Sequence, residues 1–240
     1  MSSYDMGRAE ADKYSLRGRV FHKLREDILD GHYRQYDELK ENTIAKELGV
    51  SRTPVREALR QLELEGLVSI VPNKGAYVNG ITAEDVRDIY LIRARLEGLC
   101  AAMASERISK EQLEELEEII CLSDFHEQKQ HYDQLCALDN KFHEVMYEAS
   151  GSKMLEHLLK DFHHYVQRVR RTTLSSGERA EKSTQEHSAI LAAIREKDPQ
   201  RADELATLHI MNTISNISHY KIENLLEAGK DKQEEKKTNG

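Results

Sequence analysis

Four side chains that can bind a transition metal recur at helical spacing in the second half of the chain. Asp139 and His143 lie four residues apart in LCALDNKFHEVMYEASG, on the side of the expected helix that carries its apolar residues. His187 and His209 interrupt apolar faces of two further helical stretches in the same way. Because a buried carboxylate is costly unless it is paired or metal-bound, this set indicates a divalent transition metal. Core residues that only hydrogen-bond to one another are the alternative.

The helices that must position these residues are expected between residues 81 and 226, a stretch with three glycines and one proline. So few helix breakers, among much Leu, Glu, Ala and Lys, favour helix almost throughout. Capping patterns and breakers divide the stretch into six expected helices, over residues 82–107, 109–128, 132–149, 153–174, 178–197 and 198–226. The short connections predict antiparallel neighbours and thus an all-α antiparallel six-helix bundle.

The first 80 residues have a different pattern, in which helices are followed by strands. An apolar stripe predicts a helix over residues 16–29, and Asn42 can cap a short helix over residues 43–48. A tight glycine turn leads to the next helix, which Ser51 can cap and which ends at Gly66. LVSIVP and AYVNGI then alternate as two strands around an NKG turn. The fold class is therefore mainly α, with an N-terminal winged helix-turn-helix and its small β-hairpin wing preceding the bundle.

The second helix of this module begins with SRTPVREALR, whose side chains suit DNA. A winged helix places this end in the major groove, and Arg52 and Arg56, four residues apart, project from one face. Arginine is suited to bidentate contact with guanine, so both are expected to read bases. Phosphate contacts, or a close approach to the backbone, are expected at Ser51, Thr53, Lys74 and Gly75. A protein-binding module with these arginines in surface ion pairs is the alternative.

The charge distribution follows the same division. The 240 residues include 35 basic and 43 acidic ones, but residues 1–80 hold 13 of each, so the net charge of −8 belongs entirely to the remainder. This balance excludes a nonspecific DNA coat and leaves room for a specific reader with few phosphate contacts. No secretory signal and no apolar run of membrane-spanning length is visible. The three cysteines have no metal or redox spacing, which indicates free thiols in a reducing cytoplasm.

Composition also predicts the domain boundaries. The expected order is a flexible N-terminus (1–13), a DNA-binding domain (14–80), a helical domain (81–226) and a disordered charged tail (227–240).

Several of these motifs resemble known families. LGVSRTPVREALRQLELEGLV and the wing NKGAYV resemble the recognition segment of GntR-family bacterial transcription regulators. IRARLEGLCAAMAS, DNKFHEVMYEASGS, QEHSAILAAI and ADELATLHI resemble the FCD ligand-binding domain of the FadR subfamily. The resemblance covers about residues 16–222 and departs from the family at Gln35-Tyr36, where many members have Pro-Gly, and at Asn42, where some have a DNA-contacting arginine.

The resemblance implies site residues. Arg52 and Arg56 would read bases while the wing enters the minor groove. The implied metal ligands are Asp139, His143, His187 and His209, with zinc as the leading metal and nickel, manganese or iron as alternatives. A small organic acid effector would bind beside the metal. Its candidate contacts are Arg93, which matches an arginine of the family's first helix, and, more weakly, Asn212, Arg168 and Arg171.

Arg93 and two further histidines have a plainer interpretation. Arg93 could instead form an ion pair with Glu97, four residues along the same helix. His163 and His164 are adjacent, so at most one faces inward, and both are interpreted as structural or exposed.

The function expected on this basis is a cytoplasmic, homodimeric transcription regulator that binds a palindromic operator. Dimerism is also a physical expectation, since one winged helix touches few base pairs. Release of DNA on effector binding is the commoner outcome in the family and would make the protein a repressor. Two alternatives remain: a regulator for which the metal itself is the signal, and, more remotely, a metal-dependent hydrolase. No enzyme is expected, because no general base accompanies the metal site.

Overall fold

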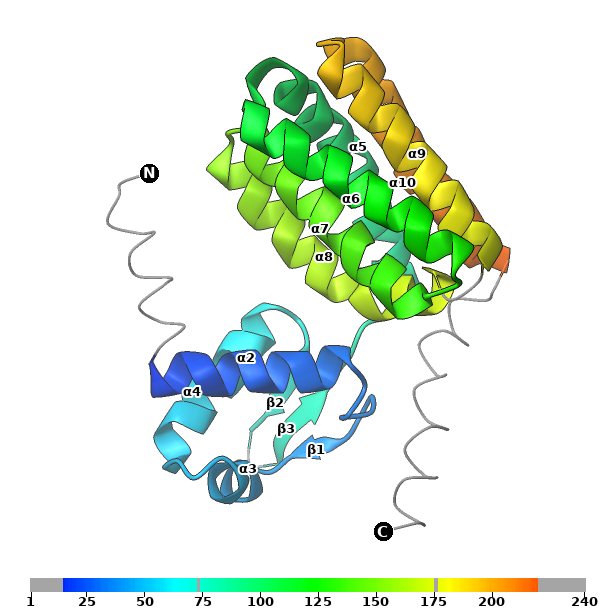
Figure 1. Ribbon diagram of the computed structural model, residues 1–240. Coiled ribbons are helices and arrows are strands. Elements are labelled where there is room, and N and C mark those ends of the chain that lie inside the picture. Colours follow the sequence, from blue (N-terminus) through cyan, green and yellow to red (C-terminus); the bar gives the residue numbers. More distant parts are fainter. Residues whose placement is uncertain (1–14, 73, 175–176, 220–240) are drawn as a thin grey trace. The chain divides into compact units, whose positions relative to one another are not determined.

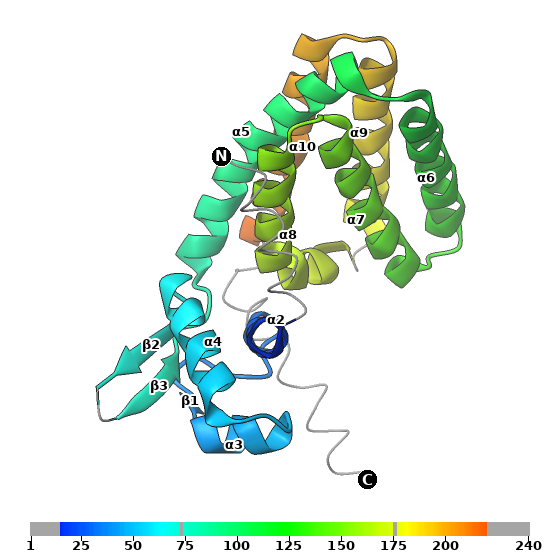
Figure 2. The ribbon, with the colours of Figure 1, turned by 90° about the vertical axis from the view of Figure 1, so that its left-hand side faces the viewer.

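A computed structural model divides the chain into two compact units, with the boundary between Ile81 and Thr82. It describes residues 15–72, 74–174 and 177–219, without the side chains of residues 168–174, 177–178 and 217–219. The predicted flexible N-terminus (1–13) and charged tail (227–240) lie outside the described residues. Figures 1 and 2 show a mainly helical chain with one small sheet in its N-terminal unit, which confirms the predicted fold class.

The described residues of the N-terminal unit form three helices and a winged sheet. Its elements are α2 (Leu16–Leu29), β1 (Glu38–Leu39), α3 (Glu41–Glu47), α4 (Arg52–Leu64), β2 (Val68–Val71) and β3 (Gly75–Val78). Helices α2 and α4 pack together, and each buries one apolar stripe. The buried stripes comprise Val20, Phe21, Leu24 and Ile28 of α2 and Val55, Ala58, Leu59 and Leu62 of α4.

The sheet contains one strand more than the sequence predicts. Strands β2 and β3 form the expected antiparallel hairpin, and β1 pairs with the other edge of β3, which places Leu39 opposite Ala76. The chain enters β1 through Tyr36, whose φ of 71° is in the left-handed region. The amide of Tyr36 donates to the carbonyl of Val78 at 2.7 Å. Tyr36 thus takes a conformation that glycine adopts more easily.

The start of helix α3 differs from the prediction. The helix begins at Glu41 with Lys40 at its N-cap, so the predicted cap at Asn42 is wrong. Strand β1 ends one residue before this cap, and an acidic first residue is favourable at the positive end of the helix. Ser51 does take the N-cap position of α4, but its side chain makes no capping hydrogen bond.

All regular secondary structure in the described residues of the C-terminal unit is helical. They are α5 (Ala83–Arg107), α6 (Lys110–Gln128), α7 (Tyr132–Ala149), α8 (Lys153–Leu174), α9 (Gly177–Arg195) and α10 (Pro199–His219). Both predicted capping boxes are present, Thr82 with Asp85 and Ser109 with Gln112. None of the described helices has the length and apolar character needed to cross a membrane.

Helix α5 contacts four other helices of this unit, α7, α8, α9 and α10. Its approach to α10 depends on Gly98, because a Cβ atom there would collide with the side chains of Asp203 and Thr207. The Thr207 hydroxyl donates to the carbonyl of Ala94 at 3.1 Å and links the two helices. These two helices pack against a hydrophobic core that includes Phe142, Met146, Leu159, Ile190 and Ile194.

Large apolar side chains remain exposed on α5 and α10. Leu91, Ile92 and Leu99 share one face of α5 by helical spacing, and Leu208 and Met211 lie on α10. Each is between 42% and 54% exposed. We call these five residues the apolar α5–α10 face.

Candidate metal centre and nucleic-acid interface

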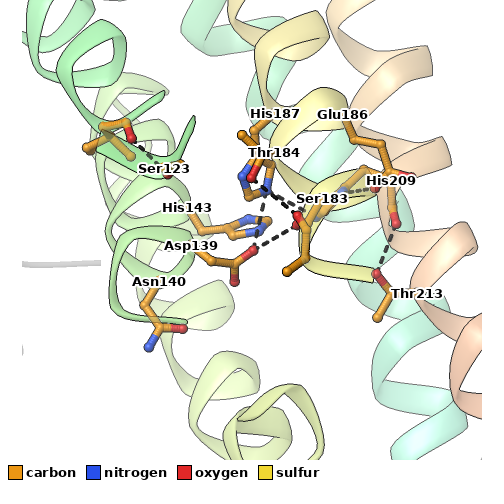
Figure 3. Close-up of polar contacts among 12 residues, drawn as sticks. Ser123, Asp139, Asn140, His143, Ser183, Thr184, Glu186, His187, His209 and Thr213 are labelled. Carbon is orange, nitrogen blue, oxygen red and sulfur yellow. Dashed lines mark hydrogen bonds and ion pairs between the residues drawn. The ribbon is translucent and has the colours of Figure 1, made fainter. Parts of the chain in front are cut away.

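Three of the four predicted metal ligands come together in the helical unit. His143 of α7, His187 of α9 and His209 of α10 are at most 4% exposed. One ring nitrogen of each lies within 4.8 Å of the others, and Figure 3 shows the rings converging between their helices. Phe142 stacks on the His187 ring at a centroid distance of 4.1 Å and holds its plane. The three histidines, which are separated by 22 to 66 positions in the sequence, thus form one buried imidazole cluster.

The hydrogen bonds of His209 indicate which nitrogen can bind a metal. Its Nδ1 lies 2.7 Å from Oε2 of Glu186, and a carboxylate accepts, so the proton is assigned to Nδ1. Its Nε2 then carries a lone pair and lies 3.3 Å from Nε2 of His187. Two nitrogens on one tetrahedral zinc ion would be about 3.3 Å apart. Burial lowers the pKa of His209 to about 4, so the ring is neutral near pH 7, as a metal ligand must be.

His143 presents a buried nitrogen to the same place. Its Nδ1 lies 2.8 Å from Oε2 of Glu97, although the two atoms are not aligned for a hydrogen bond. Its Nε2 is buried and makes no hydrogen bond within the described part of the chain. A buried polar atom without a partner is costly, and a metal ion would satisfy it. The three imidazoles therefore fit a divalent transition metal.

Asp139 lies at the edge of the cluster. Its Oδ1 accepts a hydrogen bond from the Ser183 hydroxyl at 3.0 Å and is 3.7 Å from Nε2 of His187 (Figure 3). The group of mutually close ligand atoms contains the three histidines and not this carboxylate. The role of Asp139 as a fourth ligand stays a prediction.

Glu186 is a functional candidate that the sequence reasoning missed. It accepts hydrogen bonds from His209, from Arg179 at 2.9 Å and from Asn212 at 2.8 Å. Burial alone would raise its pKa, but the His209 hydrogen bond and the Arg179 charge hold it at about 2. Asn212, predicted to contact an effector, is exposed and bound to this carboxylate. The one sequence signal for Glu186 was its position beside His187.

Replacing Glu186 by Gln is expected to weaken metal binding about 10- to 100-fold, as losing such outer partners does elsewhere. The amide cannot hold the His209 ring by a charge-assisted hydrogen bond, so the ring loses its fixed tautomer and orientation. Competition with a chromophoric chelator measures the affinity. Glu196→Gln, which changes an exposed glutamate just beyond α9, is the control. Equal affinities for both variants would argue against this role.

Arg93 is buried beside the cluster and forms the ion pair that was the alternative to effector binding. Its Nε donates to Oε1 of Glu97 at 2.9 Å, and the Tyr147 hydroxyl donates to the same oxygen. Glu97 thus links Arg93 to His143. The Nη1 atom of Arg93 is buried and has no hydrogen-bond partner within the described residues, so one guanidinium donor remains available.

The remaining polar residues considered in the sequence are Arg168, Arg171, His163 and His164. The side chains of Arg168 and Arg171 lie outside the described residues. His163 is buried, and its Nε2 is 2.8 Å from the Asn140 side-chain oxygen, while His164 is exposed. Burial lowers the pKa of His163 well below its usual value, so the ring is neutral. Both histidines agree with the structural or exposed interpretation.

The predicted DNA-contacting residues are all exposed. Ser51, Arg52, Thr53 and Arg56 lie at the start of α4, and Lys74 and Gly75 at the wing tip. Gly75 has a φ of 119°, which few other residues adopt, so the tight wing turn requires glycine. Arg52 and Arg56 each form an ion pair with Glu41 of α3 at 3.0 Å. The surface therefore offers arginine side chains at a helix start beside a narrow wing.

Two segments of the chain match known protein families. Residues 16–78 match "Bacterial regulatory proteins, gntR family", and residues 88–212 match the "FCD domain". The HTH-type transcriptional regulator YdhC of Bacillus subtilis is 29% identical over 220 residues, covering 89% of this chain and 93% of that protein. The HTH-type transcriptional repressor RspR of Escherichia coli is 26% identical over 206 residues, covering 86% and 90%.

A solved structure has the same fold. Escherichia coli McbR/YncC superimposes with a TM-score of 0.67 at 22% identity, over 86% of this chain and 99% of that one.

Proposed function

Since this chain belongs to the gntR family of bacterial regulatory proteins and carries an FCD domain, we propose that it is a homodimeric repressor controlled by a small organic acid bound beside a divalent metal. The chain is a DNA-binding transcription regulator and not an enzyme, so the hydrolase alternative is set aside. The observation that carries the proposal is the buried histidine cluster with Arg93 beside it. The similarity to RspR, named a repressor, supports the sign of control.

An anionic effector suits the groups around the cluster. His143, His187 and His209 would hold the metal, with Asp139 as a fourth ligand, and zinc is the leading candidate. A bound metal would supply positive charge that attracts a carboxylate. The Nη1 of Arg93, which has no partner among the described residues, can donate a charge-assisted hydrogen bond to the same carboxylate.

Control of DNA binding requires that the effector bind two states of the protein unequally. Helix α5 is suited to differ between such states, because it carries Arg93 on its buried face and begins five residues after the end of strand β3. We infer that effector binding changes the position of α5 and, through it, the spacing of the two DNA-binding units in a dimer.

The apolar α5–α10 face supports dimer formation. Large apolar side chains exposed on neighbouring helices are typical of interaction sites, and a symmetric dimer uses the same face twice. Two copies would then present two recognition helices to the two halves of a palindromic operator.

Selection of a bound sequence from a random duplex library tests this proposal. The metal-loaded protein is expected to enrich a palindrome, and one member of a panel of mono- and dicarboxylic acids is expected to release it. Release that requires both acid and metal supports the effector role. If metal alone, without any acid, switches operator binding on or off, the metal itself is the signal, which is the second candidate function. No enrichment at all would contradict DNA reading.

Arg52→Ala or Arg56→Ala is expected to cost about 1–3 kcal/mol of discrimination between the enriched operator and random duplex, because each removes a bidentate base contact. Fluorescence anisotropy with both duplexes measures the ratio. Arg60→Ala is the matched control, since Arg60 is exposed on the same helix and pairs with Glu57. Unchanged preference in both variants would refute the assignment of the recognition helix.

A further inference from the structure

A single carboxylate binds both arginines of the recognition helix. Glu41 Oε2 accepts hydrogen bonds from Nη2 of Arg52 and Nη2 of Arg56, both at 3.0 Å. Its Oε1 accepts from Nε of Arg56 at 3.1 Å, so the Arg56 contact is bidentate. The hydrogen bond from Arg56 lowers the pKa of Glu41, and the carboxylate is therefore charged near pH 7.

Glu41 occupies one of the guanidinium edges that can contact DNA. Bidentate contact with guanine uses two parallel N–H groups of one arginine, and the Nε and Nη2 groups of Arg56 already donate to Glu41. The same edge would hold a phosphate. Any duplex must therefore displace Glu41 from the arginines or share them with it. The negative charge of Glu41 also repels a phosphate placed nearby.

We propose that Glu41 is a specificity-determining residue that competes with DNA for Arg52 and Arg56 and suppresses binding to non-operator sequences. This inference rests on the proposed function. Displacing the carboxylate breaks two ion pairs, and only an operator can recover that cost, with base acceptors for the arginines and a base amino donor for the displaced carboxylate. Non-operator DNA offers mainly phosphate attraction, which the nearby carboxylate weakens. Removing Glu41 should therefore strengthen non-operator binding more than operator binding.

The arrangement differs from an ordinary surface ion pair. On α4, Arg60 pairs with Glu57 three residues away, a one-to-one contact within a single helix. Glu41 instead reaches from α3 to two arginines that lie one turn apart on α4. Both arginine side chains remain about half exposed, at 58% and 49%, so DNA can reach them once the carboxylate moves.

The test compares full-length Glu41→Gln, the control Glu57→Gln and the wild type. The probes are a fluorescent random-sequence duplex and the duplex that the wild type enriches from a random library. For Glu41→Gln we expect binding to the random duplex to tighten about tenfold, the worth of two exposed ion pairs. Its affinity should also fall more steeply with salt, by about one unit of slope for each arginine that gains a phosphate. Operator binding should change less, so the specificity ratio falls.

The possible results separate cleanly. Glu57→Gln should match the wild type on both duplexes, and equal thermal melting of all three proteins shows that the fold is kept. The inference is overturned if Glu41→Gln binds both duplexes as the wild type does. It is also overturned if that variant loses operator affinity while its random-duplex affinity stays the same, because Glu41 would then orient the arginines. If the wild type itself enriches no sequence, the proposed function fails before Glu41 is tested.

Discussion

Purified His143→Ala/His187→Ala protein is expected to contain no bound transition metal. The double substitution removes two of the three buried imidazoles and leaves His209 with the carboxylate of Asp139 at the cluster edge. Zinc sites in proteins usually have three or four protein ligands, so the two that remain are too few to hold the metal. Elemental analysis of wild type and variant, each expressed in medium with added zinc, measures the metal content per chain.

The matched control is His157→Ala/His164→Ala, which removes two exposed histidines of α8. This control should keep the metal content of the wild type, so a loss in both double variants would indicate only adventitious binding by surface histidines. A full metal load in His143→Ala/His187→Ala would refute the ligand assignment. Removing metal from the wild type with a chelator should also lower its melting temperature, because a ligand that binds only the folded state stabilises it.

Arg93→Ala is expected to lower the free energy of unfolding by about 3–5 kcal/mol, the usual cost of leaving one partner of a buried ion pair alone. Arg93 and Glu97 are each 1% exposed, so water cannot replace the lost partner. The Tyr147 hydroxyl and His143 remain near the carboxylate and offset only part of this cost. Urea unfolding followed by circular dichroism measures the difference.

Arg95→Ala is the control, since Arg95 is exposed on the same helix. The pH dependence gives a second check. Burial opposes ionisation of Glu97, but the Arg93 charge and the contacts with His143 together hold the Glu97 pKa well below the ordinary value of 4.5. The pair therefore stabilises the fold above pH 4.5, and this contribution is lost as the pH falls further. The difference between Arg93→Ala and the wild type should shrink in acid, and a constant difference would contradict the ion-pair explanation.

This expected instability changes how the effector role of Arg93 should be tested. An alanine variant would confuse lost binding with lost folding. Arg93→Lys keeps the positive charge near Glu97 but lacks the planar fork that binds a carboxylate with two parallel hydrogen bonds. Weaker release of operator by the acid, with metal content unchanged, would support a direct contact.

The elements of the fold that could be predicted are those with local causes. The capping boxes at Thr82 and Ser109 place helix starts through contacts three residues apart, and both are confirmed. Strand β1 could not be predicted, because two residues show no alternation and its pairing partner Tyr77 is far along the chain. The start of α3 was placed too late for the same reason, since that strand delivers the chain to Lys40.

The candidate site divides in the same way. His143, His187 and His209 could be found because each polar ring interrupts an otherwise apolar helix face. Glu186 could not be found, because it is one of several charged residues on α9. Its contact with His209 joins two helices through residues that are 23 positions apart in the sequence. Helical spacing shows which face a residue lies on. It does not show which residue of another helix is opposite.

Helix α5 carries charged and apolar features on opposite sides of one continuous element. Arg93 is buried on one side, while Leu91 and Ile92 are exposed on the other. A hydrogen-bonded helix of 25 residues turns nearly as a rigid body, so rotation about its axis moves both sides through the same angle. An anion that draws Arg93 toward itself would therefore reorient the surface on which a second copy would pack. Occupancy of a buried site would then be expressed as a twist between two subunits.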